Sequence, residues 1–295
     1  MTYAHGPSAE RMPEWLRRPI ARPGRQATVR ATLGELGLHT VCQSAKCPNQ
    51  GECFSAGTAT FLIMGDACTR GCRFCAVETR APEPLDSDEP RRVAEAASCM
   101  GLRHVVVTTV TRDDLADGGA THFVAVIEAL RAMLPQSAVE VLTSDFAGNE
   151  AAIDTMAAAR PDVFNHNLET IPRLYAEVRP GAAYSRSLRL LARVKETQPD
   201  LPTKSGLMLG LGESPEEVAA VMRDLRAVGC DMLTLGQYLR PSKQHLPVVE
   251  FVPPAVFEEL EREAYRIGFA AVASAPFVRS SFHAQEMAEA ALGER

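Results

Sequence analysis

Six of the eight cysteines in this 295-residue chain fall within residues 42–75, in two groups of three with different spacing. The two groups are Cys42, Cys47 and Cys53, followed by Cys68, Cys72 and Cys75. Thiolates are soft ligands that bind zinc and iron–sulfur clusters, and in a reducing compartment they do not pair as disulfides. The spacing therefore predicts two metal centres, each with three sulfur ligands.

A set of three cysteines leaves a closed metal site one ligand short. Structural zinc normally has four Cys or His ligands, so each zinc would need a distant fourth residue. A [4Fe–4S] cluster held by three cysteines has one iron free for a substrate or cofactor. The spacing of Cys68, Cys72 and Cys75 favours this cluster, and Phe74 is placed to shield it from water. Structural zinc sites remain the alternative.

The segment CTRGCRFC at residues 68–75 resembles the cluster motif of the radical S-adenosylmethionine (SAM) enzymes, whose open iron binds SAM. The preceding CQSAKCPNQGEC and the C-terminal RSSFHA, residues 279–284, are similar to segments of the lipoyl synthase family. Other segments that resemble this family are PEWLRRPI, TVTRDDLADGGA, NHNLETIPRLY, KSGLMLGLGE and YLRPSKQHLPV. The resemblance therefore extends over nearly the whole chain after its first residues.

The resemblance implies two [4Fe–4S] clusters with different tasks. The second group of cysteines would hold the cluster that binds SAM and cleaves it reductively. The first group would hold an auxiliary cluster that supplies sulfur, with Ser281 as its fourth ligand. From the residues alone, Ser281 is equally explained as the N-cap of a terminal helix. No role is assigned to His283.

The activity that the resemblance implies is a sulfurtransferase reaction. Two sulfur atoms enter at C6 and C8 of an octanoyl chain on a lysine of another protein, after a radical derived from SAM removes hydrogen. The implied carriers are the lipoyl domains of 2-oxoacid dehydrogenase complexes and the glycine-cleavage H protein. A low-potential electron donor such as ferredoxin or flavodoxin, and an iron–sulfur carrier for cluster repair, are also implied. The alternatives are another radical SAM enzyme and a metal-stabilised binding module.

The elements that must position these residues begin near residue 60, where β-branched apolar runs alternate with helical patterns. Strands are predicted at residues 60–64, 104–110, 139–144, 163–168, 204–209 and 232–238. Helices are predicted at residues 90–100, 120–133, 150–159, 186–196, 215–228 and 254–267. This alternation predicts an α/β fold with a parallel sheet covered by helices. Six units are too few for a closed eight-unit barrel, and the resemblance implies a partial (β/α)6 TIM-like barrel of the radical SAM type.

Three segments, packed as one globular unit, follow from this interpretation. Residues 1–59 form an N-terminal arm with the auxiliary-cluster segment, and residues 60–268 form the barrel. Residues 269–295 form a C-terminal extension that carries the RSSFHA motif. Within the extension, a short strand is expected at residues 269–274 and a helix at residues 282–292.

Residues of the fourth strand are the predicted SAM contacts. Chemistry in α/β barrels gathers at the C-terminal ends of the strands, which is where the second group of cysteines follows the first strand. Asn165, Asn167 and Glu169 occupy alternate positions along the strand, so their side chains project to the same side of the sheet. The resemblance makes them SAM contacts, and the alternative is that they satisfy one another and nearby backbone. Lys204 is either half of a buried pair or a substrate contact.

Composition excludes some classes of function. The formal net charge of −6 argues against a nucleic-acid-binding protein, which would have a basic surface. No apolar run approaches the roughly 20 residues of a membrane span, and no secretory signal follows Met1. A cytoplasmic protein without nucleic-acid or membrane partners is expected.

Several other polar residues are expected to be structural. Asp113, Asp114 and Asp117 are predicted to be solvated or to cap the next helix rather than to bind a cation. Cys99 and Cys230 lie outside the two groups and are predicted to be core residues.

Overall fold

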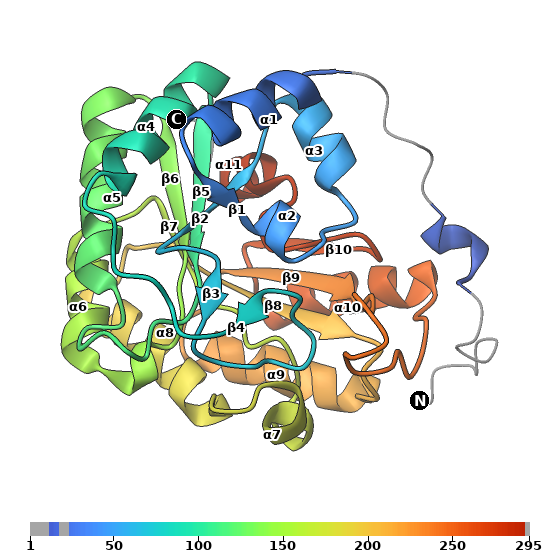
Figure 1. The fold of residues 1–295 in the computed structure, drawn as a ribbon. Coiled ribbons are helices and arrows are strands. Elements are labelled where there is room, and N and C mark those ends of the chain that lie inside the picture. Colours follow the sequence, from blue (N-terminus) through green and yellow to red (C-terminus); the bar gives the residue numbers. More distant parts are fainter. Residues whose placement is uncertain (1–11, 18–23, 293–295) are drawn as a thin grey trace.

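The computed structural model describes residues 12–17 and 24–292 of the chain. Within these residues, eight strands form one sheet in the order β1-β2-β5-β6-β7-β8-β9-β10 (Figure 1). Their bounds are β1 His39–Thr40, β2 Thr60–Ile63, β5 His104–Thr109, β6 Ala138–Leu142, β7 Val163–Asn165, β8 Thr203–Leu209, β9 Met232–Gln237 and β10 Ala271–Ser274. Neighbouring strands are parallel, except for β1 and β2, which are antiparallel.

The parallel strands, from β2 to β10, follow the order of the chain because each helical connection returns to the next position in the sheet. The edge strands β1 and β10 do not pair with each other, so the described barrel is open on one side. The predicted α/β fold with a partial barrel is therefore confirmed. The short strand expected after residue 268 is also confirmed, as β10.

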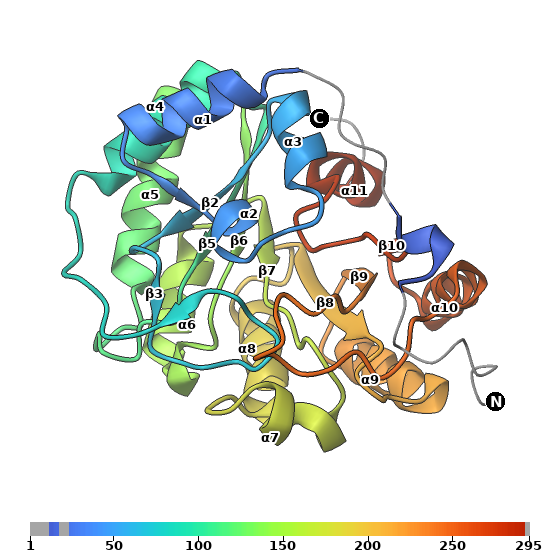
Figure 2. The ribbon, with the colours of Figure 1, turned by 45° about the vertical axis from the view of Figure 1, so that its right-hand side comes forward.

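Six helices cover the outer face of the sheet (Figure 1 and Figure 2). Their bounds are α4 Glu89–Met100, α5 Ala120–Met133, α6 Glu150–Ala158, α8 Tyr184–Thr197, α9 Pro215–Ala227 and α10 Pro254–Ile267. Each turns an apolar stripe inward, as α10 does with Phe257, Leu260 and Ala264. Helix α9 begins with a capping box, in which the Ser214 side chain accepts from the amide of Glu217.

Helix α11, Ala284–Leu292, lies across the bottom of the open barrel. Its Met287 and Ala288 pack against Val163, Met232 and Ala271, the first residues of three strands. The helix also contacts β5 on the other side of the gap. The segment just before α11 is therefore directed into the barrel.

The N-terminal part packs over the open side (Figure 2). It consists of η1 Glu14–Leu16, α1 Gln26–Glu35, α2 Val41–Ser44 and α3 Gln50–Ala56. Helix α1 is amphipathic, and its Val29 and Leu33 are buried. The short helices α2 and α3 carry Cys42 and Cys53 of the first group.

The loop with the second group of cysteines forms a small sheet of β3 Ala67–Cys68 and β4 Glu78–Thr79. Three short helical segments follow later strands: η2 Phe146–Gly148, η3 Pro172–Leu174 and α7 Tyr175–Val178. These elements of two to four residues have no periodic pattern and were not predicted.

The two remaining cysteines differ in environment. Cys230 is buried, as predicted, whereas Cys99 is exposed. The core prediction for Cys99 is wrong because it lies on the solvent side of α4, while Val93, Ala97 and Met100 form the buried side. No helix in the described ranges is long and apolar enough to cross a membrane.

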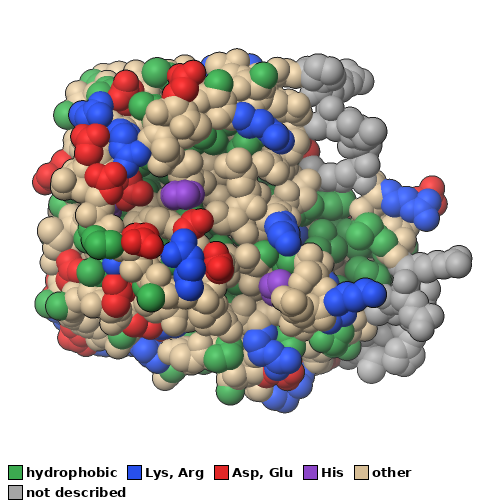
Figure 3. All heavy atoms as spheres, in the orientation of Figure 1, with side chains coloured by type: hydrophobic (Ala, Val, Ile, Leu, Met, Phe, Trp, Pro, Cys, Tyr) green, Lys and Arg blue, Asp and Glu red, His purple; other side chains and the backbone are tan. Residues whose placement is uncertain are grey.

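Charged side chains are unevenly distributed on the face drawn in Figure 3. Asp and Glu gather mainly on its left, over the α4 to α6 side, with Lys and Arg among them, whereas the charged side chains toward the middle and right are mostly Lys and Arg.

Candidate metal and cofactor site

The second group of cysteines lies in the loop between β3 and β4. Cys68 ends β3, and its sulfur accepts the amides of Thr111 at 3.3 Å and Arg70 at 3.5 Å. Burial and the neighbouring thiols raise the pKa of Cys75 to about 12, and burial also raises the pKa of Cys72. A cationic metal centre is therefore needed to keep these sulfurs as thiolates.

These three cysteines line the larger cavity of the site, of about 470 Å³. The other walls come from the C-terminal ends of β5, β6, β8 and β9, which is the rim that the barrel prediction indicated. Phe74 also lines this cavity and packs against the core. The cavity therefore has room for a cofactor beside the cysteine loop.

Two of the three predicted SAM contacts reach the larger cavity. Asn167 Nδ2 donates to Glu169 Oε1 at 3.0 Å and to Ser280 Oγ at 2.6 Å. Burial raises the pKa of Glu169, whose backbone has a left-handed φ of 70°. This uncommon conformation directs a carboxyl group toward the cysteine loop and is typical of functional positions.

Asn165 does not line the larger cavity, so the structure does not support its prediction as a SAM contact. It lies one pleat deeper, where its Nδ2 donates to Glu140 Oε1 at 3.2 Å. Lys204 Nζ contacts the same oxygen at 3.0 Å, and both members of this ion pair are buried. Lys204 is therefore half of a buried pair. Although burial alone would raise the pKa of Glu140, the charges of Lys204 and His104 hold it below its ordinary value.

Arg179 is a site residue that the sequence analysis missed. Its guanidinium lines the larger cavity and is buried beside Cys72 and Glu169. Nη1 donates to the carbonyl of Asn167 at 2.8 Å, but Nε has no partner among the described residues. A buried N–H without a partner is costly, so this position fits an anionic group of a ligand. No sequence pattern marked Arg179, because it follows the short α7.

A chain of hydrogen bonds holds Arg179 in place. Arg179 Nη1 donates to Tyr175 Oη at 2.7 Å, which in turn contacts Ser187 Oγ at 2.8 Å. Ser187 contacts His166 Nε2, and His166 Nδ1 contacts the carbonyl of Thr143, each at 2.9 Å. Burial and the Arg179 charge lower the pKa of His166 to about 4, so its neutral ring donates through Nδ1 and accepts through Nε2.

Arg70, between Cys68 and Cys72 in the chain, ties the cysteine loop to the barrel. Its Nε and Nη2 form a bidentate pair with Asp113 at 2.6 and 2.7 Å, and Nη1 contacts buried Asp145 at 2.8 Å. Asp113 was predicted to be solvated or capping, but it serves as this partner. Asp117 does cap α5, because its side chain accepts the amides of Gly119 and Thr121.

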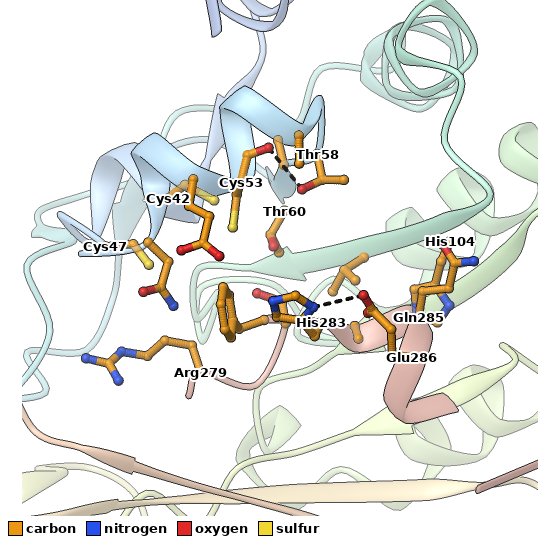
Figure 4. Close-up of a pocket in the computed structure, with 18 residues that line it drawn as sticks. Cys42, Cys47, Cys53, Thr58, Thr60, His104, Arg279, His283, Gln285 and Glu286 are labelled. Carbon is orange, nitrogen blue, oxygen red and sulfur yellow. Dashed lines mark hydrogen bonds and ion pairs between the residues drawn. The ribbon is translucent and has the colours of Figure 1, made fainter. Parts of the chain in front are cut away.

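The first group of cysteines lines a second cavity, of about 190 Å³ (Figure 4). Cys42 lies in α2, Cys53 in α3 and Cys47 in the turn between them. Burial raises the pKa of Cys42 to about 11 and, with the neighbouring thiols, that of Cys53 to about 12. Figure 4 shows His283 and Arg279 across the cavity from these sulfurs.

Ser281 lines both cavities, as do Cys42 and Cys47, so the two cavities share a wall. Ser281 is not at the N-cap position, because α11 begins three residues later at Ala284. The His283 carbonyl accepts the first helical bond, from Met287, so His283 occupies that position instead. The capping explanation of Ser281 is therefore unsupported.

Each group of thiols surrounds a cavity rather than a point. In the described part of the chain, no three Cys, His, Asp or Glu side chains are placed to hold one metal ion. Cysteines on a four-iron cluster bind different irons and need not converge on one point. The donor sets therefore fit clusters, and Arg179 and Glu169 line the same cavity as the second set.

Comparisons with known proteins agree with this geometry. A family model described as the radical SAM superfamily matches residues 62–225. The lipoyl synthase of Caldanaerobacter subterraneus subsp. tengcongensis is 60% identical over 93% of this chain and 96% of its own. That of Methylococcus capsulatus is 57% identical over 94% of this chain and 87% of its own.

Solved structures of low sequence identity share the fold alone. Methylornithine synthase (PylB) is 14% identical, with a TM-score of 0.56 over 85% of this chain and 75% of that chain. HydG, a maturase of the [FeFe]-hydrogenase, is 15% identical, with a TM-score of 0.56 over 83% of this chain and 66% of that chain.

Proposed function

We infer that this chain, which belongs to the lipoyl synthase family of the radical SAM superfamily, inserts two sulfur atoms, at C6 and C8, into a protein-bound octanoyl chain. It is a sulfurtransferase that uses [4Fe–4S] clusters and SAM, and its substrates are octanoylated lipoyl-carrier proteins. The observation that carries this inference is the pair of cavities with a shared wall, each lined by three thiols.

The proposed roles of the cysteines follow from the cavity that each group lines. Cys68, Cys72 and Cys75 hold the cluster beside the SAM site, and Phe74 shields that cluster from water. The first group of cysteines holds the auxiliary cluster together with Ser281. When bound, these clusters and SAM supply the electron, the hydrogen-abstracting radical and the sulfur for the reaction.

We propose that three side chains orient SAM in the larger cavity. Arg179 binds its carboxylate, since the guanidinium is buried and its Nε has no partner among the described residues. Asn167 and Glu169 accept hydrogen bonds from donor groups of SAM. Their hydrogen bond to each other and the fixed backbone of Glu169 reduce the reorganisation needed on binding.

The octanoyl chain is proposed to lie along the apolar part of the larger cavity. Leu62, Leu142 and Met208, from β2, β6 and β8 respectively, line it. These side chains exclude water, and an octanoyl chain packed against them lies between the two groups of cysteines. The substrate carbons then lie near the wall shared with the auxiliary cavity, which aligns them with the sulfur source for two successive insertions.

The division of labour among the segments is also a proposal. Residues 1–59 and 269–295 contribute most of the auxiliary site, and residues 60–268 contribute the SAM site. The lipoyl domains of 2-oxoacid dehydrogenase complexes and the glycine-cleavage H protein are the proposed carriers. Ferredoxin or flavodoxin is the proposed electron donor, and an iron–sulfur carrier the proposed source of repair. We propose the cytoplasm as the location, because the thiols must remain reduced.

Anaerobic reconstitution tests the proposal. The protein should contain about eight irons, because each of two clusters holds four. With dithionite, SAM and an octanoyl-lysyl peptide it should yield 5′-deoxyadenosine and lipoyl peptide. The triple variant Cys42→Ala, Cys47→Ala, Cys53→Ala should yield 5′-deoxyadenosine alone. Lipoyl product from this variant would refute the assigned sulfur source, and loss of 5′-deoxyadenosine would refute the separation of tasks.

A further inference from the structure

The larger cavity is cationic although the chain as a whole is acidic. Its described lining includes one carboxylate, that of Glu169, and the side chains of Lys46, Arg70, Arg179, Arg240 and Arg279. The formal charge of the chain is −6. The excess of positive charge is therefore local to this cavity.

Some of these cations have functions inside the protein. Arg70 is paired with Asp113 and Asp145, and Arg179 is buried near Glu169. Lys46 and Arg240 are different, because both are exposed and neither forms an ion pair with a described acidic residue. Arg240 donates only to the carbonyls of Lys243 and His245.

Lys243 adds a third exposed cation beside Arg240, again without an ion pair among the described residues. We call Lys46, Arg240 and Lys243 the basic rim. Its members come from two sides of the cavity. Lys46 lies between Cys42 and Cys47 of the first group, whereas Arg240 and Lys243 belong to the loop after β9.

The loop after β9 is fixed on the cysteine loop. His245 Nε2 contacts the carbonyl of Cys75 at 3.0 Å, and the amide of Leu246 donates to the carbonyl of Arg73 at 3.1 Å. Lys46 has a left-handed φ of 52° and lies directly before Cys47. The basic rim is therefore built on backbone segments that also position the cysteines.

We propose that the basic rim is the docking surface for the carrier protein, and that it recognises an acidic surface around the octanoylated lysine. This proposal rests on the proposed function, because it names the partner of the same site. The octanoyl chain enters the larger cavity, so the protein surface around its lysine must meet the mouth of that cavity. Exposed unpaired cations at such a position steer an acidic partner and fix its orientation.

Charge reversal tests the docking surface in the reconstituted holoenzyme. Lys243→Glu, alone and with Lys46→Glu, is compared with Arg223→Glu, an exposed arginine on α9. The substrates are an octanoylated lipoyl domain and a short octanoyl-lysyl peptide, with dithionite as reductant so that no protein donor takes part. The rim variants should lose about tenfold in kcat/KM for the domain, with weaker salt dependence. Turnover of the peptide should not change in Lys243→Glu, and Arg223→Glu should change turnover of neither substrate.

The outcomes separate docking from other roles. Equal losses with the domain and the peptide, or equal loss in Arg223→Glu, would overturn the proposal, as would unchanged kinetics with the domain. Iron content controls for damage to the cluster next to Lys46 and to the cluster on the cysteine loop, which the loop with Lys243 contacts. A loss seen only when a protein donor replaces dithionite would assign the rim to that donor instead. Failure of the unsubstituted enzyme to convert the peptide would refute the proposed function itself.

Discussion

Tyr175 supports the proposed SAM site although its side chain does not line the larger cavity. Its hydroxyl accepts from Arg179, and the guanidinium also lies over its ring, 5.3 Å from the centroid. Arg179 is therefore held in place by a residue that lies outside the cavity lining. The same applies to Ser187, the next residue in the hydrogen-bond chain.

Tyr175→Phe should weaken SAM binding, because it keeps the ring and removes the hydroxyl. A hydrogen bond to a charged group contributes about 1.5–3 kcal/mol, so KM for SAM should rise by about tenfold or more. Steady-state SAM cleavage measures this change. Tyr184→Phe is the control, since its hydroxyl binds Asp224 near the surface. An unchanged KM in Tyr175→Phe would contradict the supporting role.

Ser281→Ala should impair sulfur insertion without destabilising α11, because Ser281 lies before the N-cap position. Loss of an outer-shell partner of a metal ligand typically costs about ten- to a hundredfold in activity, so loss of a ligand should lower lipoyl product by at least about tenfold. SAM cleavage and the melting temperature should stay unchanged. Ser280→Ala is the matched control. Ser280 binds Asn167, so its loss should affect KM for SAM instead. Full product formation by Ser281→Ala would show that the serine is not a ligand.

At the scale of elements, the pair of Lys204 and Glu140 joins β8 to β6 inside the barrel. Lys204→Met should lower the free energy of unfolding by about 3–5 kcal/mol, because it leaves a buried carboxylate without its partner. The double variant Lys204→Met, Glu140→Leu should recover most of this loss. Urea titration measures both. Arg189→Met, which breaks a surface pair with Glu150, should cost less than about 1 kcal/mol. Equal costs for the two single variants would refute the argument.

The same pair predicts a pH dependence of stability. The pKa of Glu140 lies below its ordinary value of 4.5, so its contribution is present above that pH and is lost as pH falls through the lower pKa of the folded state. In the parent protein, the free energy of unfolding measured by urea titration should be lower at about pH 4 than at pH 7. This difference should be smaller in the double variant. An identical loss in both would assign the acid sensitivity to other groups.

Elements with a long periodic pattern could be predicted from the sequence, whereas contacts made by short segments could not. Strands β2 and β5 to β9, and the helices that cover them, were recognised because β-branched runs alternate with amphipathic stretches. Asn165, Asn167 and Glu169 do share a parity, but sequence does not show how deep in the barrel each lies. Arg179 comes from a turn after the four-residue α7, and only the folded chain brings it beside Cys72.

At the scale of the whole molecule, Gly236 lets the C-terminal segment lie directly on β9. A Cβ at this position would stand 2.1 Å from the carbonyl oxygen of Val278, a backbone atom that cannot move easily. On the other side, Asn49 Nδ2 donates to the carbonyl of Phe277 at 2.8 Å. The segment that carries Ser281 is therefore held between the barrel and the N-terminal arm.

Gly236→Ala should displace this segment and reduce sulfur insertion more than SAM cleavage. Gly34→Ala is the control, because a Cβ there meets nothing within 4 Å, and its effect should be neutral or slightly stabilising. The ratio of lipoyl product to 5′-deoxyadenosine over one time course measures the difference. An unchanged ratio in Gly236→Ala would show that close packing at β9 does not position Ser281.

The wall shared by the two cavities also orders events during synthesis of the protein. It combines Cys42 and Cys47 with Ser281, which lies near the opposite end of the chain. The ribosome releases the cysteines well before the serine, which follows every strand of the barrel. The auxiliary cavity is therefore complete only once the segment with Ser281 has been made and α11 has docked. Loading of that site is a late maturation step, and a nascent chain that stalls before its last helix would expose three thiols without an enclosed site.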